Sequence, residues 1–359
     1  MNDFTLNLPL NRTSLGQVSI CIAKEIYKRG LNPCIFPIGG IDLISHKIDK
    51  DFNSWLTEGV QKSQCKHSRH SHSLKLWHLN GGLEKFSDNQ SLFTFQETDQ
   101  FTEAEINVIH NQNHVFFSNN YLVDIAKSYG LHNVSYCPLG YDAESFYKLN
   151  KKYYNDDRIV FGIFGKFEQR KGHLRAIQTW CKKYANNKKY MLHLSIGNSF
   201  LTPEQNNQIL GQIFGSQKPW NVNILNISQT NAEYNDVLNS IDIVIDASHN
   251  ENWSLPSFQA VGLGKWGVLH GVCGISEWAN NQNSVLFEPN GKMLDIYDNM
   301  FFGKGQQFSQ GKYYDWNEES LIVAMEKAEK LAKTPNPEGE KLRETFSYSR
   351  VVDTILQNL

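Results

Sequence analysis

Residues 159–173 read Ile-Val-Phe-Gly-Ile-Phe-Gly-Lys-Phe-Glu-Gln-Arg-Lys-Gly-His. The apolar start, rich in β-branched and aromatic residues, predicts a buried strand that ends just before Lys166. A short loop then carries Arg170 and Lys171, and a helix is expected to begin near Gly172. This order suits a diphosphate, because a helix start offers free N–H groups and the cations supply charge. A solvated basic helix face is the alternative interpretation of the same pattern.

Residues 246–260 form a second informative stretch, Asp-Ala-Ser-His-Asn-Glu-Asn-Trp-Ser-Leu-Pro-Ser-Phe-Gln-Ala. It also follows a predicted strand and enters a predicted helix. Glu251 falls on the loop, where a carboxylate can accept hydrogen bonds from sugar hydroxyls. The amides of Ser254 and Leu255, near the helix start, can hold an oxyanion. Taken alone, the stretch also fits a helix start with ordinary capping residues.

Strand and helix signals alternate throughout the second half of the chain. The helix signals include capping boxes at residues 202–205 and 230–233. The expected strands are residues 159–164, 191–196, 222–227, 241–245, 266–270 and 285–287, and the expected helices include residues 174–184, 256–263 and 316–333. This alternation predicts an α/β fold with a parallel, doubly wound sheet, which binds ligands beyond the carboxyl ends of its strands.

The first half begins with a strand, a helix and a second strand. The signals that follow are weaker. The expected strands are residues 4–10, 34–38, 74–77, 92–95, 115–117 and 134–137, the expected helices begin at Ser14 and Tyr121, and residues 62–72 are read as a polar loop. A chain of 359 residues favours two domains. We place an N-terminal domain at 1–150, a linker at 148–158, a C-terminal domain at 158–340, and a final helix at 341–359 that packs back toward the N-terminal domain.

The composition is that of an ordinary folded chain, with 40% hydrophobic and 20% charged residues and a formal net charge of -2. A dedicated duplex-DNA binder is more often basic. The six cysteines are scattered and form no C-x-x-C pair, which is typical of reduced thiols. Residues 1–4 show no leader pattern, and no apolar run reaches a membrane-spanning length. We therefore expect a cytoplasmic protein, with peripheral membrane contact left open and the oligomeric state undecided.

Together the two stretches resemble the retaining glycosyltransferases of the family 4 type. That family carries a G-R-x…K-G phosphate loop and, further along the chain, E-G-F-G-L-P-x-x-E-A. Gly165-Lys166 and Lys171-Gly172 match the first motif, with Lys in place of Arg, and residues 251–260 match the second. Weaker matches occur in the family's order at residues 115–118 with Gly130, residues 138–142 with Phe146, residues 274–277, and the loop at Gly16.

The resemblance implies the GT-B architecture, two Rossmann-like doubly wound domains facing across a cleft. The C-terminal domain would hold a nucleoside-diphosphate sugar as co-substrate, with no cofactor and no metal. Lys166 and Lys171 would bind the diphosphate and stabilise it as it leaves, and Glu251 would contact the transferred sugar. The remaining donor-binding residues carried over from the family are Gly16, Gly165, Arg170, Asn252, Trp253, Ser254, Leu255 and Gln259.

Two positions depart from the family pattern. The second glutamate of the family motif, which contacts the nucleotide ribose, is Gln259 here. An amide accepts hydrogen bonds without charge assistance, so we expect weaker binding at that point. The family's G-F-G is Asn252-Trp253-Ser254, which predicts a bulkier wall around the sugar.

Histidines offer one further catalytic candidate. His78 follows a predicted strand and precedes two glycines, so it is the best match to the family's N-terminal-domain histidine. His110 and His114 are weaker rivals. The histidines within residues 67–72 fit no firm metal template, and a solvated loop is the preferred interpretation.

These observations predict retaining transfer of a sugar to an acceptor hydroxyl, most simply on a saccharide or lipid-linked glycan. One alternative acceptor is a hydroxymethylated base of viral DNA, which the basic segment at residues 62–75 permits. A third class is a non-catalytic nucleotide-sugar-binding protein, suggested by Gln259.

Overall fold

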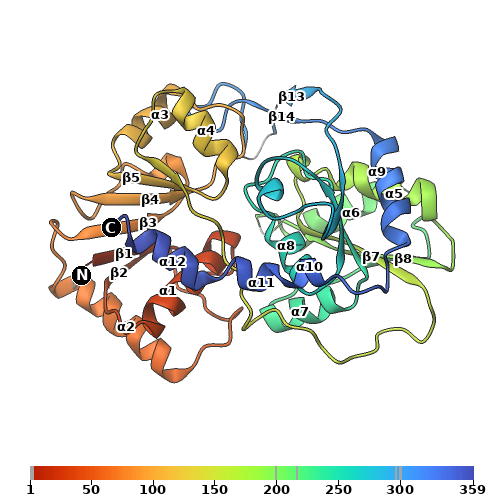
Figure 1. The fold of residues 1–359 in the computed structure, drawn as a ribbon, viewed down its shortest axis with the longest axis horizontal. Helices are drawn as coiled ribbons and strands as arrows, with labels where there is room; N and C mark the ends of the chain where they lie inside the picture. The colour runs from red at the N-terminus through yellow and green to blue at the C-terminus, as the bar shows by residue number, and fades with distance from the viewer. Residues whose placement is uncertain (1–3, 199, 216, 296, 299–300) are drawn as a thin grey trace. The chain divides into compact units, whose positions relative to one another are not determined.

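The computed structural model describes residues 4–198, 200–215, 217–295, 297–298 and 301–359 (Figure 1). Met1 to Asp3, on which the expectation about a leader partly depends, lie outside these residues. The chain divides into two compact units. Unit 1 comprises Met1–Ser145, Ile296–Lys312 and Arg343–Leu359, and unit 2 comprises Phe146–Asp295 and Tyr313–Leu342.

Unit 1 is built on a six-stranded sheet in the order β2-β1-β3-β4-β5-β6, with every neighbouring pair parallel. Its elements are β1 (Phe4–Leu8), α1 (Ser14–Lys28), β2 (Cys34–Pro37), α2 (Lys50–Cys65), β3 (His72–Leu76), η1 (Leu79–Gly81), β4 (Gln90–Thr94), α3 (Glu103–His110), β5 (His114–Phe117), α4 (Asn120–Ser128) and β6 (Val134–Tyr136). The C-terminal helix α12 (Tyr348–Leu356) also belongs to this unit.

Helix α12 packs beside α1 in unit 1 (Figure 1). Its apolar face, which includes Val351 and Val352, is buried. Arg29 at the end of α1 bonds Asp353 at 2.7 Å and the Ser349 carbonyl at 2.8 Å. The last helix is therefore part of the first unit's core although about 200 residues separate it from β6.

Unit 2 repeats this plan with the sheet order β12-β11-β10-β7-β8-β9, again parallel throughout. Its elements are β7 (Ile159–Lys166), η2 (Gln169–Lys171), α5 (His173–Tyr184), β8 (Tyr190–Gly197), α6 (Pro203–Phe214), β9 (Val222–Ile224), α7 (Asn231–Asn239), β10 (Ile243–Asp246), α8 (Leu255–Gly262), β11 (Trp266–His270), η3 (Cys273–Glu277), β12 (Ser284–Phe287), α9 (Glu318–Glu329) and α10 (Pro337–Glu340). Between α10 and α12 lies the short α11 (Leu342–Thr345), and β13 (Met293–Asp295) pairs with β14 (Lys312–Tyr314) as a separate two-stranded sheet.

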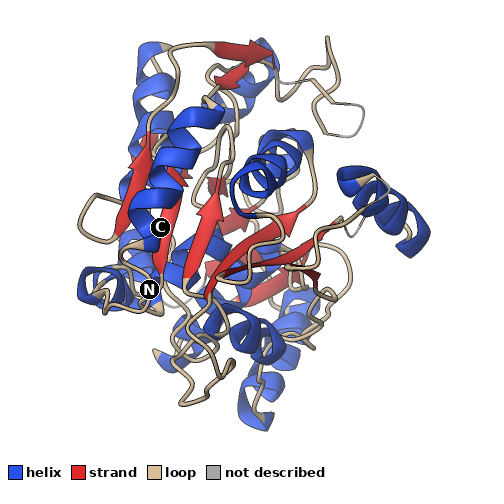
Figure 2. Ribbon diagram, turned by 90° about the vertical axis from the view of Figure 1, so that its right-hand side faces the viewer, coloured by secondary structure: helices blue, strands red, loops and turns tan. Residues whose placement is uncertain are grey.

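Helices flank both large sheets (Figure 2). In unit 2, α5 contacts α6 and α9, whereas α8 contacts α7 and α10, so the two groups cover different faces. The core of the first face is aromatic: Trp180 and Trp316 are fully buried, and Phe161 stacks on Tyr184 at 5.4 Å. Burying such side chains contributes roughly 1.5–3 kcal/mol each. The α/β, doubly wound prediction is confirmed for both sheets.

The least regular stretch of the sequence was misread in part. Residues 62–72 were expected to be a loop, but residues 62–65 form the last turn of α2. The buried positions of α2 include Phe52, Trp55 and Leu56, which lie on one helix face with Gly59. The polar residues at 62–65 continue that helix because tertiary packing of its apolar face overrides local composition.

Among the described residues, no helix combines the length and apolar character needed to cross a bilayer.

Candidate active site

The strongest candidate site lies at the carboxyl ends of β7 and β10 in unit 2. These strands are neighbours, with Ile243 paired to Phe161, and they end at Lys166 and Asp246. The chain places β8 and β9 on one side of β7 and then returns to place β10, β11 and β12 on the other. Such a reversal of strand order is where open parallel sheets bind ligands.

The loop after β7 leads directly into the start of α5. Gly172 caps this helix at φ 63°, in the left-handed region. A Cβ at Gly172 would lie 2.5 Å from the carbonyl oxygen of Ala247 in the loop after β10. The amide of His249 also donates to the Arg170 carbonyl at 2.8 Å. Glycine is therefore required here, because the two loops touch and the backbone turns sharply.

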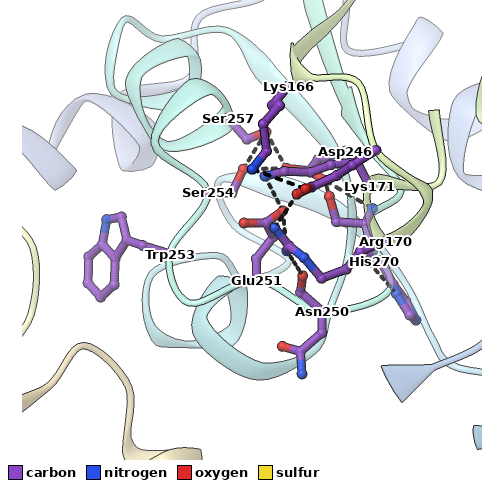
Figure 3. Close-up of polar contacts among 12 residues, drawn as sticks. Lys166, Arg170, Lys171, Asp246, Asn250, Glu251, Trp253, Ser254, Ser257 and His270 are labelled. Atoms are coloured by element: carbon purple, nitrogen blue, oxygen red, sulfur yellow. Dashed lines mark hydrogen bonds and ion pairs between the residues drawn. The ribbon is translucent and has the colours of Figure 1, made fainter. Parts of the chain in front are cut away.

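Arg170 forms the centre of a buried charge network (Figure 3). Its side chain is 4% exposed and donates to Glu168 at 2.6 Å, to Glu251 at 3.1 Å and to the Asn250 carbonyl. Lys171 Nζ donates to the same carboxylate oxygen of Glu251. Arg170 therefore holds the two loops together from inside the protein.

Lys166 lies at the more open side of the network. Its Nζ is 3.1 Å from Glu168, and its side chain is 33% exposed. Burial alone would raise the pKa of Glu168, but the adjacent Arg170 and Lys166 lower it to about 2. Glu168 is therefore a carboxylate at neutral pH, and it offsets part of the positive charge that the sequence places in this loop.

The last residue of β10 is an acid that sequence reasoning did not select. Asp246 accepts hydrogen bonds from the amide and hydroxyl of Ser248, at 3.0 and 2.5 Å. It also accepts from the hydroxyls of Ser254 and Ser257 (Figure 3). Burial would raise its pKa, but the charge of Lys171 and these hydrogen bonds lower it. The signal available in the sequence was an acid placed at the end of a predicted apolar strand.

His270 was also missed by the sequence analysis. It ends β11, is fully buried, and its Nδ1 is 2.9 Å from the Ser248 carbonyl (Figure 3). Burial lowers its pKa to about 4, so it is neutral at pH 7. This contact connects the end of β11 to the loop that follows β10.

Trp253 points away from the charge network (Figure 3). Its ring is 2% exposed and packs edge-on against Phe258 at 5.4 Å. Its carbonyl accepts a hydrogen bond from Trp278 at 2.8 Å. The ring, expected to thicken the wall around the sugar, is part of the core instead, so only the backbone at this position can line the site.

The other predicted donor residues in unit 2 lie on these two loops or on the elements that border them. Gly165 precedes Lys166 within β7, and Leu255 begins α8. Asn252 and Gln259 are both buried, the latter within the second turn of α8.

Gly16 and His78 belong to unit 1. Gly16 lies in the first turn of α1, where a Cβ would meet the Asn11 carbonyl oxygen at 2.1 Å. His78 lies two residues after the end of β3 and is half-buried beside Trp77. Both residues therefore lie in the segments that follow the carboxyl ends of adjacent strands, β1 and β3.

The rival histidines occupy other places. His114 begins β5, at the opposite end of the sheet from His78, and His110 ends α3. His67 contacts Thr5 at 3.1 Å and the Phe86 carbonyl at 2.8 Å. Within the described part of the chain, the ligand atoms that lie close enough together to hold a metal ion belong to Cys21, His46 and Asp142. The histidines within residues 67–72 are not part of this group.

No protein-family model matches the chain, and no curated protein matches it. Solved structures do. Sucrose-phosphate synthase from Thermosynechococcus elongatus aligns at TM-score 0.71 and 11% identity, covering 99% of this chain and 98% of that one. The chain has the GT-B fold.

Further structures agree over similar lengths. A glycosyltransferase from Rickettsia africae aligns at TM-score 0.66 and 13% identity, covering 99% of this chain and 97% of the other. HepE from Anabaena, solved with UDP-glucose, aligns at TM-score 0.64 and 11% identity over both whole chains. At these identities the likeness establishes the fold.

Proposed function

We propose that the chain is a retaining glycosyltransferase that moves a sugar from a nucleoside-diphosphate sugar to an acceptor hydroxyl. One observation carries the proposal: Lys171 and Glu251, 80 positions apart, meet at the strand-order reversal of unit 2, beside the start of α5. A cation, a carboxylate and free helix amides together can bind a diphosphate and a sugar hydroxyl.

The diphosphate is assigned to the start of α5. This helix has 12 residues, and its dipole favours negative charge at the end where Lys171 and Gly172 lie. Lys171 has a side chain 14% exposed, so water screens it weakly. Lys166 supplies a second, more accessible ammonium group. We propose that these two cations offset the charge that develops on the departing diphosphate, without a metal.

The sugar is assigned to Glu251. Its carboxylate is held by Arg170 and Lys171, which fixes its orientation before a donor arrives. On donor binding, the ammonium of Lys171 would turn to the phosphate and the carboxylate would accept from sugar hydroxyls. The amides of Ser254 and Leu255, at the start of α8, would complete the donor contacts. UDP-glucose in the structurally similar HepE supports a nucleotide-hexose donor.

The acceptor is proposed to be a saccharide or lipid-linked glycan. The case for DNA depended on the basic segment at residues 62–75. Lys75 in that segment is 3% exposed and donates to the carbonyls of Gly81 and Glu84, so it cannot reach a phosphate backbone. Lys62 bonds the Asn32 carbonyl. A cytoplasmic location, with or without peripheral membrane contact, is part of this proposal.

A thermal-shift screen of nucleotide sugars, followed by mass spectrometry of acceptors incubated with the best donor, tests the function. We expect stabilisation by one nucleotide sugar and a product heavier by one sugar. Transfer to short oligosaccharides would support the saccharide assignment, whereas activity confined to DNA and steeply reduced by salt would refute it. Binding of a nucleotide sugar, with neither transfer of the sugar nor hydrolysis of the donor, would indicate a non-catalytic binding protein.

Lys171→Ala should lower kcat by on the order of 10²-fold or more, because the ammonium group acts where charge develops in the transition state. Lys182→Ala is the matched control, since Lys182 lies on α5, the helix that follows Lys171, but pairs with Glu318 at the surface. Equal turnover by the two variants would refute the role of Lys171.

A further inference from the structure

Ser254 has a backbone conformation that non-glycine residues rarely adopt. It lies at φ 61° and ψ 73°, in the left-handed region, immediately before α8. This conformation is unfavourable for a residue with a Cβ, so neighbouring contacts must hold it in place. The family 4 motif described above has glycine at this position, which needs no such support.

Asp246 supplies those contacts. The hydroxyl of Ser254 donates to one carboxylate oxygen, and the hydroxyl of Ser257 donates to the same oxygen at 2.8 Å. The other oxygen accepts from the amide and hydroxyl of Ser248. Four donors thus meet the roughly four acceptor positions of one carboxylate. An asparagine in its place has one oxygen and an NH₂ group that donates, so it cannot serve all four.

We propose that Asp246 is a positioning residue that holds Ser254 in the left-handed conformation and thereby aims the first amides of α8 at the donor. This inference deepens the proposed function and rests on it. Asp246 lies at the end of β10, and its side chain accepts hydrogen bonds from residues at the start of α8. These two elements border the site. Ser254 and Asp246 act as a pair. A side chain at position 254 adds backbone strain, and the hydrogen bond to Asp246 offsets that strain.

A double-mutant cycle in kcat/KM for the donor tests this pairing, using Asp246→Asn, Ser254→Gly and the two combined. Asp246→Asn in the wild-type background should lower kcat/KM by about tenfold or more, the loss expected for hydrogen bonds to a charged group. In the Ser254→Gly background the same change should cost less than about threefold, because glycine adopts the conformation unaided.

The double-mutant cycle distinguishes the contact between Asp246 and Ser254 from the electrostatic effect of the Asp246 charge. Removing the negative charge of Asp246 alters the field at the diphosphate equally in both backgrounds, so the difference between the two losses reports the contact with Ser254. Asp315→Asn is the matched control. Asp315 is a carboxylate of the same unit that bonds Arg175 at 2.7 Å, so its effect should be equal in both backgrounds.

Ser254→Ala provides a second test that leaves Asp246 intact. Alanine keeps the unfavourable backbone conformation and loses the hydroxyl, so this variant should have a lower kcat/KM than Ser254→Gly. Equal losses from Asp246→Asn in both backgrounds, or equal activity of the alanine and glycine variants, would overturn the inference.

A wild-type protein that binds no nucleotide sugar would refute the proposed function instead. The same cycle, measured in urea unfolding, would then still report on the pairing of Asp246 with Ser254. Coupling there would support the positioning contact, and its absence would overturn it.

Discussion

Glu168→Gln removes one charge from the network around Arg170 and keeps the shape of the side chain. Glu168 is 8% exposed and lies 2.6 Å from Arg170 and 3.1 Å from Lys166. Its pKa is about 2, against 4.5 for an ordinary glutamate. That difference corresponds to about 3 kcal/mol of folding free energy at pH 7.

The pH dependence of this contribution has a defined sign. A carboxyl whose pKa is lowered by folding stabilises the protein above its unfolded pKa, and this stabilisation is lost as the pH falls toward the folded value. The wild type should therefore exceed Glu168→Gln by about 3 kcal/mol at pH 7 and by about half of that at pH 3.

Urea unfolding followed by tryptophan fluorescence measures this difference. The signal reports mainly on unit 2, which contains six of the eight tryptophans: Trp180, Trp220, Trp253, Trp266, Trp278 and Trp316. Glu318→Gln is the control, because that carboxylate pairs with Lys182 at the surface and should contribute less than about 1 kcal/mol. A Glu168 difference below about 1 kcal/mol at pH 7, or one equal at pH 7 and pH 3, would refute the reasoning.

Three further substitutions test backbone conformation and buried contacts. Gly172→Ala should destabilise by about 1–3 kcal/mol in urea unfolding, because the backbone is left-handed and the Cβ meets a carbonyl oxygen. Gly211→Ala, in an exposed helix with nothing within 4 Å, should instead stabilise by roughly 0.5–1 kcal/mol, and a loss at both positions would contradict the distinction. Lys75→Met should cost about 1–3 kcal/mol, because the carbonyls of Gly81 and Glu84 lose their donor. An unchanged unfolding midpoint in that variant would show that the buried ammonium group contributes nothing.

The second half of the fold could be predicted well from the sequence, because its signals are local. The strand at residues 159–164 is a continuous apolar run, and the structure places β7 there. The expected capping boxes at Thr202 and Thr230 are both present, with Gln205 and Glu233 completing them. Such signals need only the residues of one segment.

The strands and helices of the first half were harder to predict, because some of their buried positions hold polar residues. Gln90 and Ser91 open β4, although neither looks like a core residue. Gln90 is 1% exposed because its amide bonds the Gly82 carbonyl and Gln112, at 2.9 Å each. These partners lie 8 and 22 residues away, so periodicity within the strand could not reveal them.

The two segments of the candidate site could be selected from the sequence, but the contacts between them could not. Lys171 and Glu251 were selected separately, and the fold brings them together. Arg170 was predicted to bind the donor, and its contact with Glu251 on the other loop could not be predicted from its own segment. Asp246 was overlooked because its role depends on the conformation of Ser254, which no local pattern specifies.

Isothermal titration of a nucleotide sugar into the wild type, Lys171→Ala and Lys182→Ala tests the central claim most directly. The claim is that the donor diphosphate binds at the carboxyl ends of β7 and β10, beside the start of α5. We predict saturable binding to the wild type, binding to Lys171→Ala weakened by about tenfold or more, and nearly unchanged binding to Lys182→Ala. Failure of every nucleotide sugar to bind the wild type, or equal affinity for all three proteins, would contradict it.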